Sequence, residues 1–184
     1  MKQWYKTRKK DPFYLKAKKN DIISRAYYKL EEIDKKHNLF KKDKKILDIG
    51  CSPGGWTQYI LKKNQKNKIV GIDILPTAKQ VEGEFKFYMM DLYQYQLIDE
   101  LFTVNKYTFD SIISDIAPNT SGNQFLDQTN SYDLSSLSAK FIEKYLNKGG
   151  NFLVKNFQGE DTEKLFNFIK KHFTKTQYVK PAAS

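Results

Sequence analysis

The chain has 184 residues, a formal net charge of +11, 15% aromatic and 29% charged residues. These proportions argue against a disordered polypeptide and predict a single folded domain over residues 1–184. No apolar run approaches the roughly 20 residues of a membrane span, the single cysteine excludes an internal disulfide, and two histidines with that cysteine argue against a zinc site, so we expect no bound metal.

Residues 1–20 combine a cluster of basic side chains with aromatic ones. These are Lys2, Lys6, Arg8, Lys9, Lys10, Lys16, Lys18 and Lys19, with Trp4, Tyr5, Phe13 and Tyr14. Basic side chains bind phosphates and aromatic side chains stack on unpaired bases, so we expect this segment to contact RNA. A solvated tail is the alternative, because only Arg8 and Arg25 are arginines and lysine enrichment can reflect the source.

From residue 21 onward, predicted strands and helices alternate. The predicted strands are Lys45–Ile49, Lys68–Asp73, Glu84–Met89, Phe109–Asp115, Asn151–Phe157 and Thr176–Lys180. The predicted helices are Asp21–Lys36, Trp56–Lys63, Tyr95–Thr103, Leu134–Leu146 and Thr162–His172. This alternation predicts an α/β fold, a mostly parallel sheet with helices on both faces. Ligands of such sheets bind beyond the carboxyl ends of the strands, where Asp73, Asp115 and Lys155 are expected.

The loop after the first predicted strand is the strongest motif. An apolar run ending in an acidic residue is followed by a glycine-rich turn and a helix start, which exposes backbone to a nucleotide-like ligand. Its candidate ligand-binding residues are Asp48, Gly50, Pro53, Gly54, Gly55 and Trp56. Asp73 follows about 20 residues later at the end of the second strand, where a carboxylate accepts hydrogen bonds from ribose hydroxyls. A tight turn without a ligand is the alternative for the loop alone.

The spacing of the glycines in this loop narrows the choice of ligand. Neither the dinucleotide pattern G-x-G-x-x-G nor the P-loop ending in Gly-Lys-Ser/Thr is present. The loop instead resembles the S-adenosylmethionine pocket of Rossmann-like methyltransferases. By that resemblance, Asp91 holds the adenine amino group, although a strand-end or capping role is its alternative. Cys51 is expected to fill the turn, because neither histidine lies near it in the sequence.

The motif Ser114–Asn119 concerns the methyl acceptor. Enzymes that methylate exocyclic base amines usually carry Asn/Asp-Pro-Pro-aromatic here, and this chain has Ser-Asp-Ile-Ala-Pro-Asn. The difference argues against methylation of a base amine. We expect Asp115 to lie at the mouth of the pocket and to orient both the cofactor and a lysine.

Several motifs together resemble the FtsJ/RrmJ family of ribose 2′-O-methyltransferases. They are Ser24–Leu30, Pro53–Trp56, Ser114–Asn119, Val154–Gly159 and Lys180–Ser184, in the family's order and spacing. The resemblance implies a Rossmann-like class I fold, S-adenosyl-L-methionine as cofactor, and a uridine of large-subunit ribosomal RNA as substrate. The partner would then be ribosomal RNA or the large ribosomal subunit.

The family uses a catalytic Lys-Asp-Lys-Glu tetrad, and motif matching assigns Lys29, Asp115 and Lys155 to its first three members. Our hypothesis is that Lys155 is the base, Lys29 lowers its pKa and holds the ribose, and Asp115 orients both. A charged steering role for Lys155 is the alternative. The family's glutamate and final antiparallel strand have no counterpart, so we expect residues 21–184 to be a C-terminally incomplete catalytic fold.

Two further interpretations remain open. The substrate can be a transfer RNA ribose instead, or the chain can be a non-catalytic RNA-binding or ribosome-assembly factor on the same scaffold. The intact Lys29, Asp115 and Lys155 argue against the assembly factor. We expect a monomer in the cytoplasm, with the mitochondrial matrix as the alternative, because no signal or transit sequence is evident.

Overall fold

The computed structural model describes residues 12–40, 44–78 and 81–182. The strands are β1 (Lys45–Ile49), β2 (Lys68–Asp73), β3 (Glu84–Met89), β4 (Phe109–Ser114) and β5 (Leu146–Val154). The helices are α2 (Pro12–Lys19), α3 (Ala26–His37), α4 (Gly55–Lys63), α5 (Tyr95–Val104), α6 (Gln124–Ala139), α7 (Phe141–Tyr145) and α8 (Thr162–Lys170). Of the N-terminal segment predicted to contact RNA, residues 1–11 lie outside the described residues.

The five strands form one parallel sheet in the order β3-β2-β1-β4-β5. The chain runs outward from β1 through β2 to β3, and then returns to β4 on the other side of β1. The strand order therefore reverses between β1 and β4, and the crevice at the carboxyl ends of these two strands is the expected ligand site.

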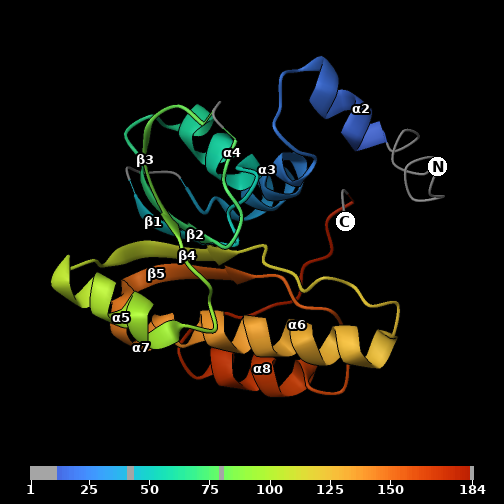
Figure 1. Ribbon diagram of the computed structural model, residues 1–184, viewed down its shortest axis with the longest axis vertical. Helices are drawn as coiled ribbons and strands as arrows, with labels where there is room; N and C mark the ends of the chain where they lie inside the picture. Colours follow the sequence, from blue (N-terminus) through green and yellow to red (C-terminus); the bar gives the residue numbers. More distant parts are fainter. Residues whose placement is uncertain (1–11, 41–43, 79–80, 183–184) are drawn as a thin grey trace.

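The central strands alternate their apolar side chains between two cores. Ile46, Ile69 and Ile113 pack with residues of α3 and α4, whereas Leu47 and Ile112 pack with residues of α5, α6 and α7. This period of two is what a strand buried on both faces requires. Figure 1 shows α3 and α4 on one side of the sheet and α5 to α8 on the other, which confirms the predicted layers.

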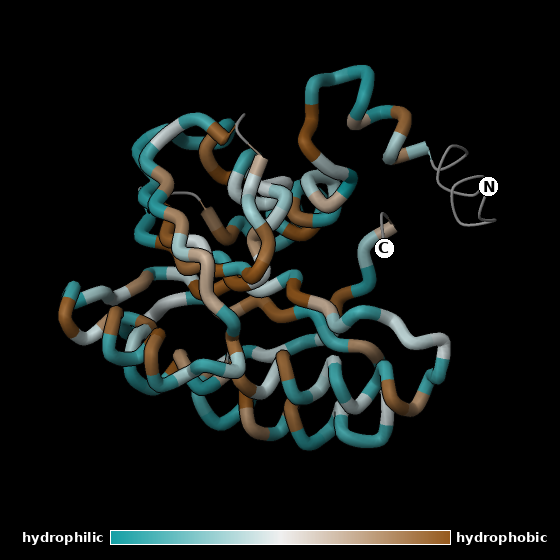
Figure 2. Tube along the Cα trace, viewed as in Figure 1, coloured by the Kyte–Doolittle hydropathy of each residue, from teal (hydrophilic) through white to brown (hydrophobic). Residues whose placement is uncertain are grey.

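The outer helices are amphipathic. Figure 2 shows α6 and α8 as alternating hydrophobic and hydrophilic stretches, the pattern of helices with one buried face. Phe102 of α5 is fully buried, and its ring lies 5.2 to 5.6 Å from those of four aromatic neighbours. None of the helices in the described part of the chain has the length and apolar composition that a bilayer span requires.

The first four strands match their predicted positions to within one residue, but one predicted helix is wrong. Instead of one helix over Leu134–Leu146, the structure has α6, beginning at Gln124, and α7, and β5 begins at Leu146. Asn123 caps α6, because its Oδ1 accepts a hydrogen bond from the Leu126 N–H at 3.2 Å. The first turns of α6 are largely exposed or half-buried, so they lack the apolar periodicity on which the prediction relied.

The predicted strand Thr176–Lys180 is also wrong, because these residues have no strand structure. The Tyr178 ring instead stacks on Phe166 of α8 with centroids 4.5 Å apart. Gln177 contacts the His37 ring with its amide 3.0 Å from Nδ1, and the Ala182 N–H donates to Glu32 at 2.9 Å. The segment therefore packs across α8 and α3 instead of pairing as a strand.

Candidate active site

The loop after β1 turns at Gly50, where the backbone must approach other chain segments closely. Gly50 has φ of +74°, and a Cβ there would lie 2.7 Å from the Ile116 backbone. Its N–H donates to the Ile72 carbonyl at 2.8 Å, and the Ser52 N–H donates to Asp73 Oδ2 at 2.8 Å. Only glycine fits at this position, and the loop is held against the end of β2.

The second half of the loop starts α4 against the segment before α3. Gly54 has φ of +114°, and a Cβ there would lie 2.6 Å from Val81, while a Cβ on Gly55 would collide with the Ser24 hydroxyl. Ser24 Oγ and Trp56 Nε1 are buried, and within the described residues neither has a hydrogen-bond partner. Two buried polar groups are thus available to a ligand at this turn.

A depression of about 200 Å³ opens between this loop and the end of β4. Its lining residues are Ser24, Ala26, Gly50, Cys51, Ser52, Pro53, Gly55, Trp56 and Asp115. Five of the predicted site residues therefore line one depression at the reversal of strand order. The sequence analysis missed Ser24 and Ala26 as lining residues, although both stand in the motif that carries Lys29.

Asp48 lies beneath the depression and is fully buried. Its Oδ2 accepts a hydrogen bond from Thr57 Oγ1 at 2.7 Å, while its Oδ1 has no partner within the described residues. Burial raises the pKa of this carboxyl to about 7, with smaller contributions from the negative charges of Asp115 and Asp73, against the Thr57 hydrogen bond that lowers it. Asp48 therefore titrates near neutral pH.

Asp73 and Asp91 mark the same edge of the sheet, outside the depression. The Asp73 carboxylate accepts hydrogen bonds from two backbone N–H groups, those of Ser52 and Leu75. Asp91 is exposed, and its Oδ1 accepts from the Tyr93 N–H at 3.0 Å. Each carboxylate oxygen can accept further hydrogen bonds. Both carboxylates therefore stabilise a local turn and can still bind a ligand.

Lys29, Asp115 and Lys155 converge from three distant segments of the chain. The Lys29 Nζ lies 3.4 Å from Asp115 Oδ1, and the Lys155 Nζ lies 3.1 Å from the same oxygen. The Lys155 Nζ also donates to the Asp115 carbonyl at 2.6 Å. The three side chains are only 16%, 17% and 25% exposed, so one carboxylate serves two partly buried ammonium groups.

The surroundings of Lys155 lower its pKa. Burial lowers the pKa of this amine, the charge and hydrogen bond of Asp115 oppose that shift, and the positive charge of Lys29 lowers the pKa further. The net direction is downward from the ordinary value of 10.5. A lysine in this environment can accept a proton more readily than a solvated one.

Three buried serines on one face of α6 hold the segment that carries Lys155. Ser135 Oγ donates to the Lys155 carbonyl at 2.8 Å, and Ser131 Oγ accepts from the Phe157 N–H at 2.9 Å. Ser138 Oγ lies 3.3 Å from the hydroxyl of Ser114, the residue before Asp115. The sequence analysis missed this row, although the helical spacing of the serines is visible in the chain.

Thiol chemistry has little support at this site. In the part of the chain that the structure describes, no three His, Cys, Asp or Glu side chains are grouped to hold a metal ion. Cys51 is buried, and burial raises the pKa of its thiol, which disfavours the reactive thiolate. Cys51 therefore fills the turn, as predicted.

Comparison with known proteins points to one family. Residues 22–184 match the family described as FtsJ-like methyltransferase. The chain is 35% identical over 175 residues to the ribosomal RNA large subunit methyltransferase E of Bdellovibrio bacteriovorus, covering 94% of this chain and 88% of that protein. It is 36% identical to the protein of the same name from Coxiella burnetii (strain Dugway 5J108-111), covering 100% and 88%.

Solved structures agree with the fold. A protein described as a ribosomal RNA methyltransferase from Plasmodium falciparum superposes with a TM-score of 0.75 at 34% identity, covering 87% of this chain and 92% of that one. The MycE methyltransferase of the mycinamycin pathway, solved with Mg and SAH, superposes with a TM-score of 0.50 at 15% identity, covering 68% and 30%. The parallel sheet and these neighbours identify a Rossmann-like methyltransferase fold.

The buried carboxyl of Asp48 makes stability depend on pH. The unfolded chain releases this proton near pH 3.8, whereas the folded protein keeps it to about pH 7. Stability from this group therefore falls as the pH rises between those values and stays lower above them. In urea unfolding at pH 5 and pH 8, the wild-type free energy should drop by about 2 to 3 kcal/mol more than that of Asp48→Asn. Parallel pH profiles for the two proteins would contradict this assignment.

Proposed function

The chain belongs to the FtsJ-like methyltransferase family, and from that premise we propose that it methylates a ribose 2′-hydroxyl in ribosomal RNA. The observation that carries the proposal is the convergence of Lys29, Asp115 and Lys155 beside the depression at the glycine-rich loop. The relatives named ribosomal RNA large subunit methyltransferase E support large-subunit ribosomal RNA as the substrate, and the family resemblance supports a uridine.

The residues around the depression fit S-adenosyl-L-methionine as the cofactor. When bound, this cofactor supplies an electrophilic methyl group. Gly50, Pro53, Gly54, Gly55 and Trp56 would hold its amino-acid and ribose parts along open backbone. The unpartnered Ser24 Oγ and Trp56 Nε1 provide polar contacts that the described residues leave unused.

The outer part of the cofactor would reach the ends of β2 and β3. Asp73 would accept hydrogen bonds from its ribose hydroxyls, and Asp91 would accept one from its adenine amino group. Asp48 supports the loop from below through Thr57. The different roles of these carboxylates follow from their burial, because Asp48 is fully buried whereas Asp91 is exposed to a ligand.

Lys29, Asp115 and Lys155 form a charged trio, and the chemistry of the acceptor assigns a role to each of them. A ribose hydroxyl is a poor nucleophile unless its proton is removed as it attacks. Lys155 in its neutral form accepts that proton. Burial lowers the pKa of Lys155, and the charge of Lys29 adds to that shift. Lys29 also donates a hydrogen bond to the ribose, and Asp115 orients both amines while balancing their charge.

The N-terminal part of the chain would contact the RNA. The last turn of α2 carries Lys16, Lys18 and Lys19, and the Lys16 Nζ lies 4.5 Å from the centre of the Tyr28 ring. Figure 1 shows α2 projecting from the side of the molecule that carries α3, the helix of Lys29. A basic helix there extends the site toward the phosphates that flank the acceptor. We propose a monomer that works in the bacterial cytoplasm, since the 35–36% identical relatives come from bacteria.

Transfer of a tritiated methyl group tests the function directly. The protein is incubated with labelled S-adenosylmethionine and, in parallel, with large ribosomal subunits, naked ribosomal RNA and transfer RNA. We expect label in the large-subunit RNA, recovered as a 2′-O-methyluridine after digestion. Label confined to transfer RNA would support a transfer RNA enzyme, and failure to bind the cofactor in calorimetry would support an assembly factor.

Lys155→Arg separates proton abstraction from charge steering. Arginine keeps the positive charge but stays protonated at every working pH. We expect methyl transfer to fall by about 100-fold or more, the usual contribution of a general base, with unchanged cofactor affinity. Lys144→Arg is the matched control, because Lys144 pairs with Asp99 at 2.7 Å away from the depression. Full activity of Lys155→Arg would exclude Lys155 as the base.

A further inference from the structure

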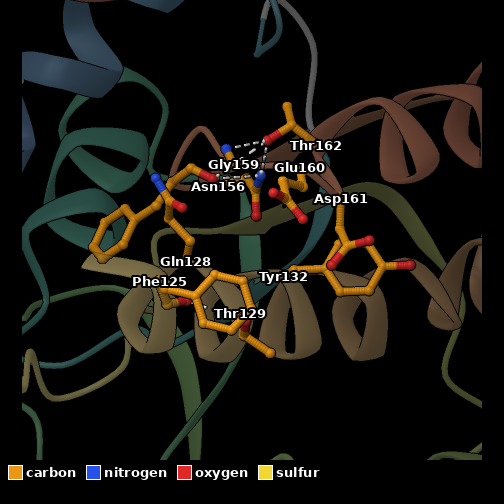
Figure 3. A pocket seen from close by; sticks show the side chains of 10 residues that line it. Phe125, Gln128, Thr129, Tyr132, Asn156, Gly159, Glu160, Asp161 and Thr162 are labelled. Atoms are coloured by element: carbon orange, nitrogen blue, oxygen red, sulfur yellow. Dashed lines mark hydrogen bonds between the residues drawn. The ribbon is translucent and has the colours of Figure 1, made fainter. Parts of the chain in front are cut away.

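A second, shallow depression lies beside the segment that carries Lys155. One wall comes from the first turns of α6, including Phe125, Gln128 and Tyr132, and the other from residues 156–162 between β5 and α8. Figure 3 shows these side chains gathered around the opening, with Asn156 and Thr162 hydrogen-bonded on one side. We call this depression the α6 groove.

One hydrogen bond joins the two walls of the α6 groove, and others stabilise the wall formed by residues 156–162. Gln128 Nε2 donates to the Gln158 carbonyl at 2.6 Å, and Asn156 Nδ2 donates to Thr162 Oγ1 at 3.2 Å. Thr162 Oγ1 also accepts from the Gly159 N–H at 2.8 Å. A Cβ at Gly159 would lie only 3.0 Å from the Gln128 side chain, so the two walls meet closely. The lining side chains are therefore held in place by the protein's own contacts, and a flat ligand would lie across the mouth of the groove.

The chemistry of the groove favours a base over a phosphate. The Phe125 ring is 67% exposed and offers a stacking surface, with Tyr132 beside it. The charged residues of the lining are Glu160 and Asp161, in a chain whose net charge is +11. Carboxylates repel phosphates but accept hydrogen bonds from exocyclic base amines, and aromatic rings stack on unpaired bases.

The position of the groove ties it to the proposed base. Asn156 directly follows Lys155, and a single hydroxyl, that of Ser135, contacts the Lys155 carbonyl at 2.8 Å and Asn156 Oδ1 at 3.2 Å. Lys155 reaches Asp115, while the Asn156 amide reaches Thr162. The groove thus begins at the residue after Lys155, which places it on the path of an RNA chain whose acceptor ribose meets Lys155.

We propose that the α6 groove binds one unpaired nucleobase adjacent to the acceptor ribose, and that this base bears an exocyclic amine. The proposal rests on the proposed function, since the acceptor is taken to be RNA. Phe125 stacks on the base and Glu160 accepts from its amine. The groove thus selects the sequence next to the modified nucleotide, a role separate from methyl transfer itself.

The test places 2-aminopurine, a fluorescent base with an exocyclic amine, at each position in turn of a single-stranded large-subunit ribosomal RNA fragment. Stacking on an aromatic ring quenches its fluorescence. We expect wild-type protein to quench one position next to the acceptor, and Phe125→Ala to abolish that quenching. Leu126→Ala is the matched control, because Leu126 is 46% exposed on the same helix but does not line the groove.

Affinity provides the second readout. Phe125→Ala should weaken binding of the fragment about 5-fold or more, as expected for one lost base stack, and Glu160→Gln should weaken it only when the flanking base carries an amine. Cofactor affinity in calorimetry should stay unchanged, which shows that the variants are folded. Equal quenching by wild-type and Phe125→Ala, or quenching at no position, would overturn the proposal. Neither readout needs turnover, so failure of the wild-type protein to methylate the fragment counts separately, against the proposed function.

Discussion

Two ammonium groups share one carboxylate at the carboxyl edge of the sheet, and most of the surrounding structure serves that arrangement. Lys29 and Lys155 both lie within 3.4 Å of Asp115 Oδ1. Each would be repelled by the other without the shared carboxylate, and each is partly removed from water. The compromise lowers the pKa of Lys155 without leaving a buried charge unpaired.

The parallel sheet brings these groups together. Asp115 follows β4 and Lys155 follows β5, and these strands pair in register at Ser114 and Val154. The Lys155 N–H continues the ladder by donating to the Ser114 carbonyl at 2.8 Å. The serine row of α6 then fixes both strand ends from one face, because hydroxyls small enough for close helix–sheet contact also satisfy the backbone there.

The same face of α6 links the charged trio to the α6 groove. Ser135 contacts both the Lys155 carbonyl and the Asn156 side chain, so one hydroxyl joins the segment of the proposed base to a wall of the groove. A shift of α6 along the sheet would therefore disturb the proposed chemistry and the proposed base recognition together.

Strong local sequence signals allow most of the sheet and the charged site residues to be predicted. The strands β1 to β4 were predictable because short apolar runs end in glycine or charged residues, and the alternation of elements implied a parallel sheet. Strand ends in such a sheet gather at one edge, which placed Asp73, Asp115 and Lys155 near each other before any coordinates were known. The roles of Lys29, Asp115 and Lys155 came from family motifs rather than from spacing alone.

The features that the sequence analysis predicted wrongly or missed depend on tertiary contacts. The start of α6 carries polar, exposed residues, so its only clear local signal was the Asn123 cap. The β-branched and aromatic residues among 176–180 suggest a strand, but the Tyr178 ring instead stacks on an aromatic ring of α8. The roles of Ser24 and of the serine row could not be predicted, although their positions are visible in the sequence, because small polar residues acquire a role only when another element packs on them.

The titration of the Lys155 amine, followed by NMR with selectively labelled lysine, tests the arrangement most directly. The signal is assigned by its absence from Lys155→Arg. A midpoint below the ordinary lysine value of 10.5 is the expected result, since burial and the Lys29 charge outweigh the attraction of Asp115. A midpoint at or above that value would show that Asp115 dominates and that Lys155 remains a charged group, which contradicts its proposed role as the base.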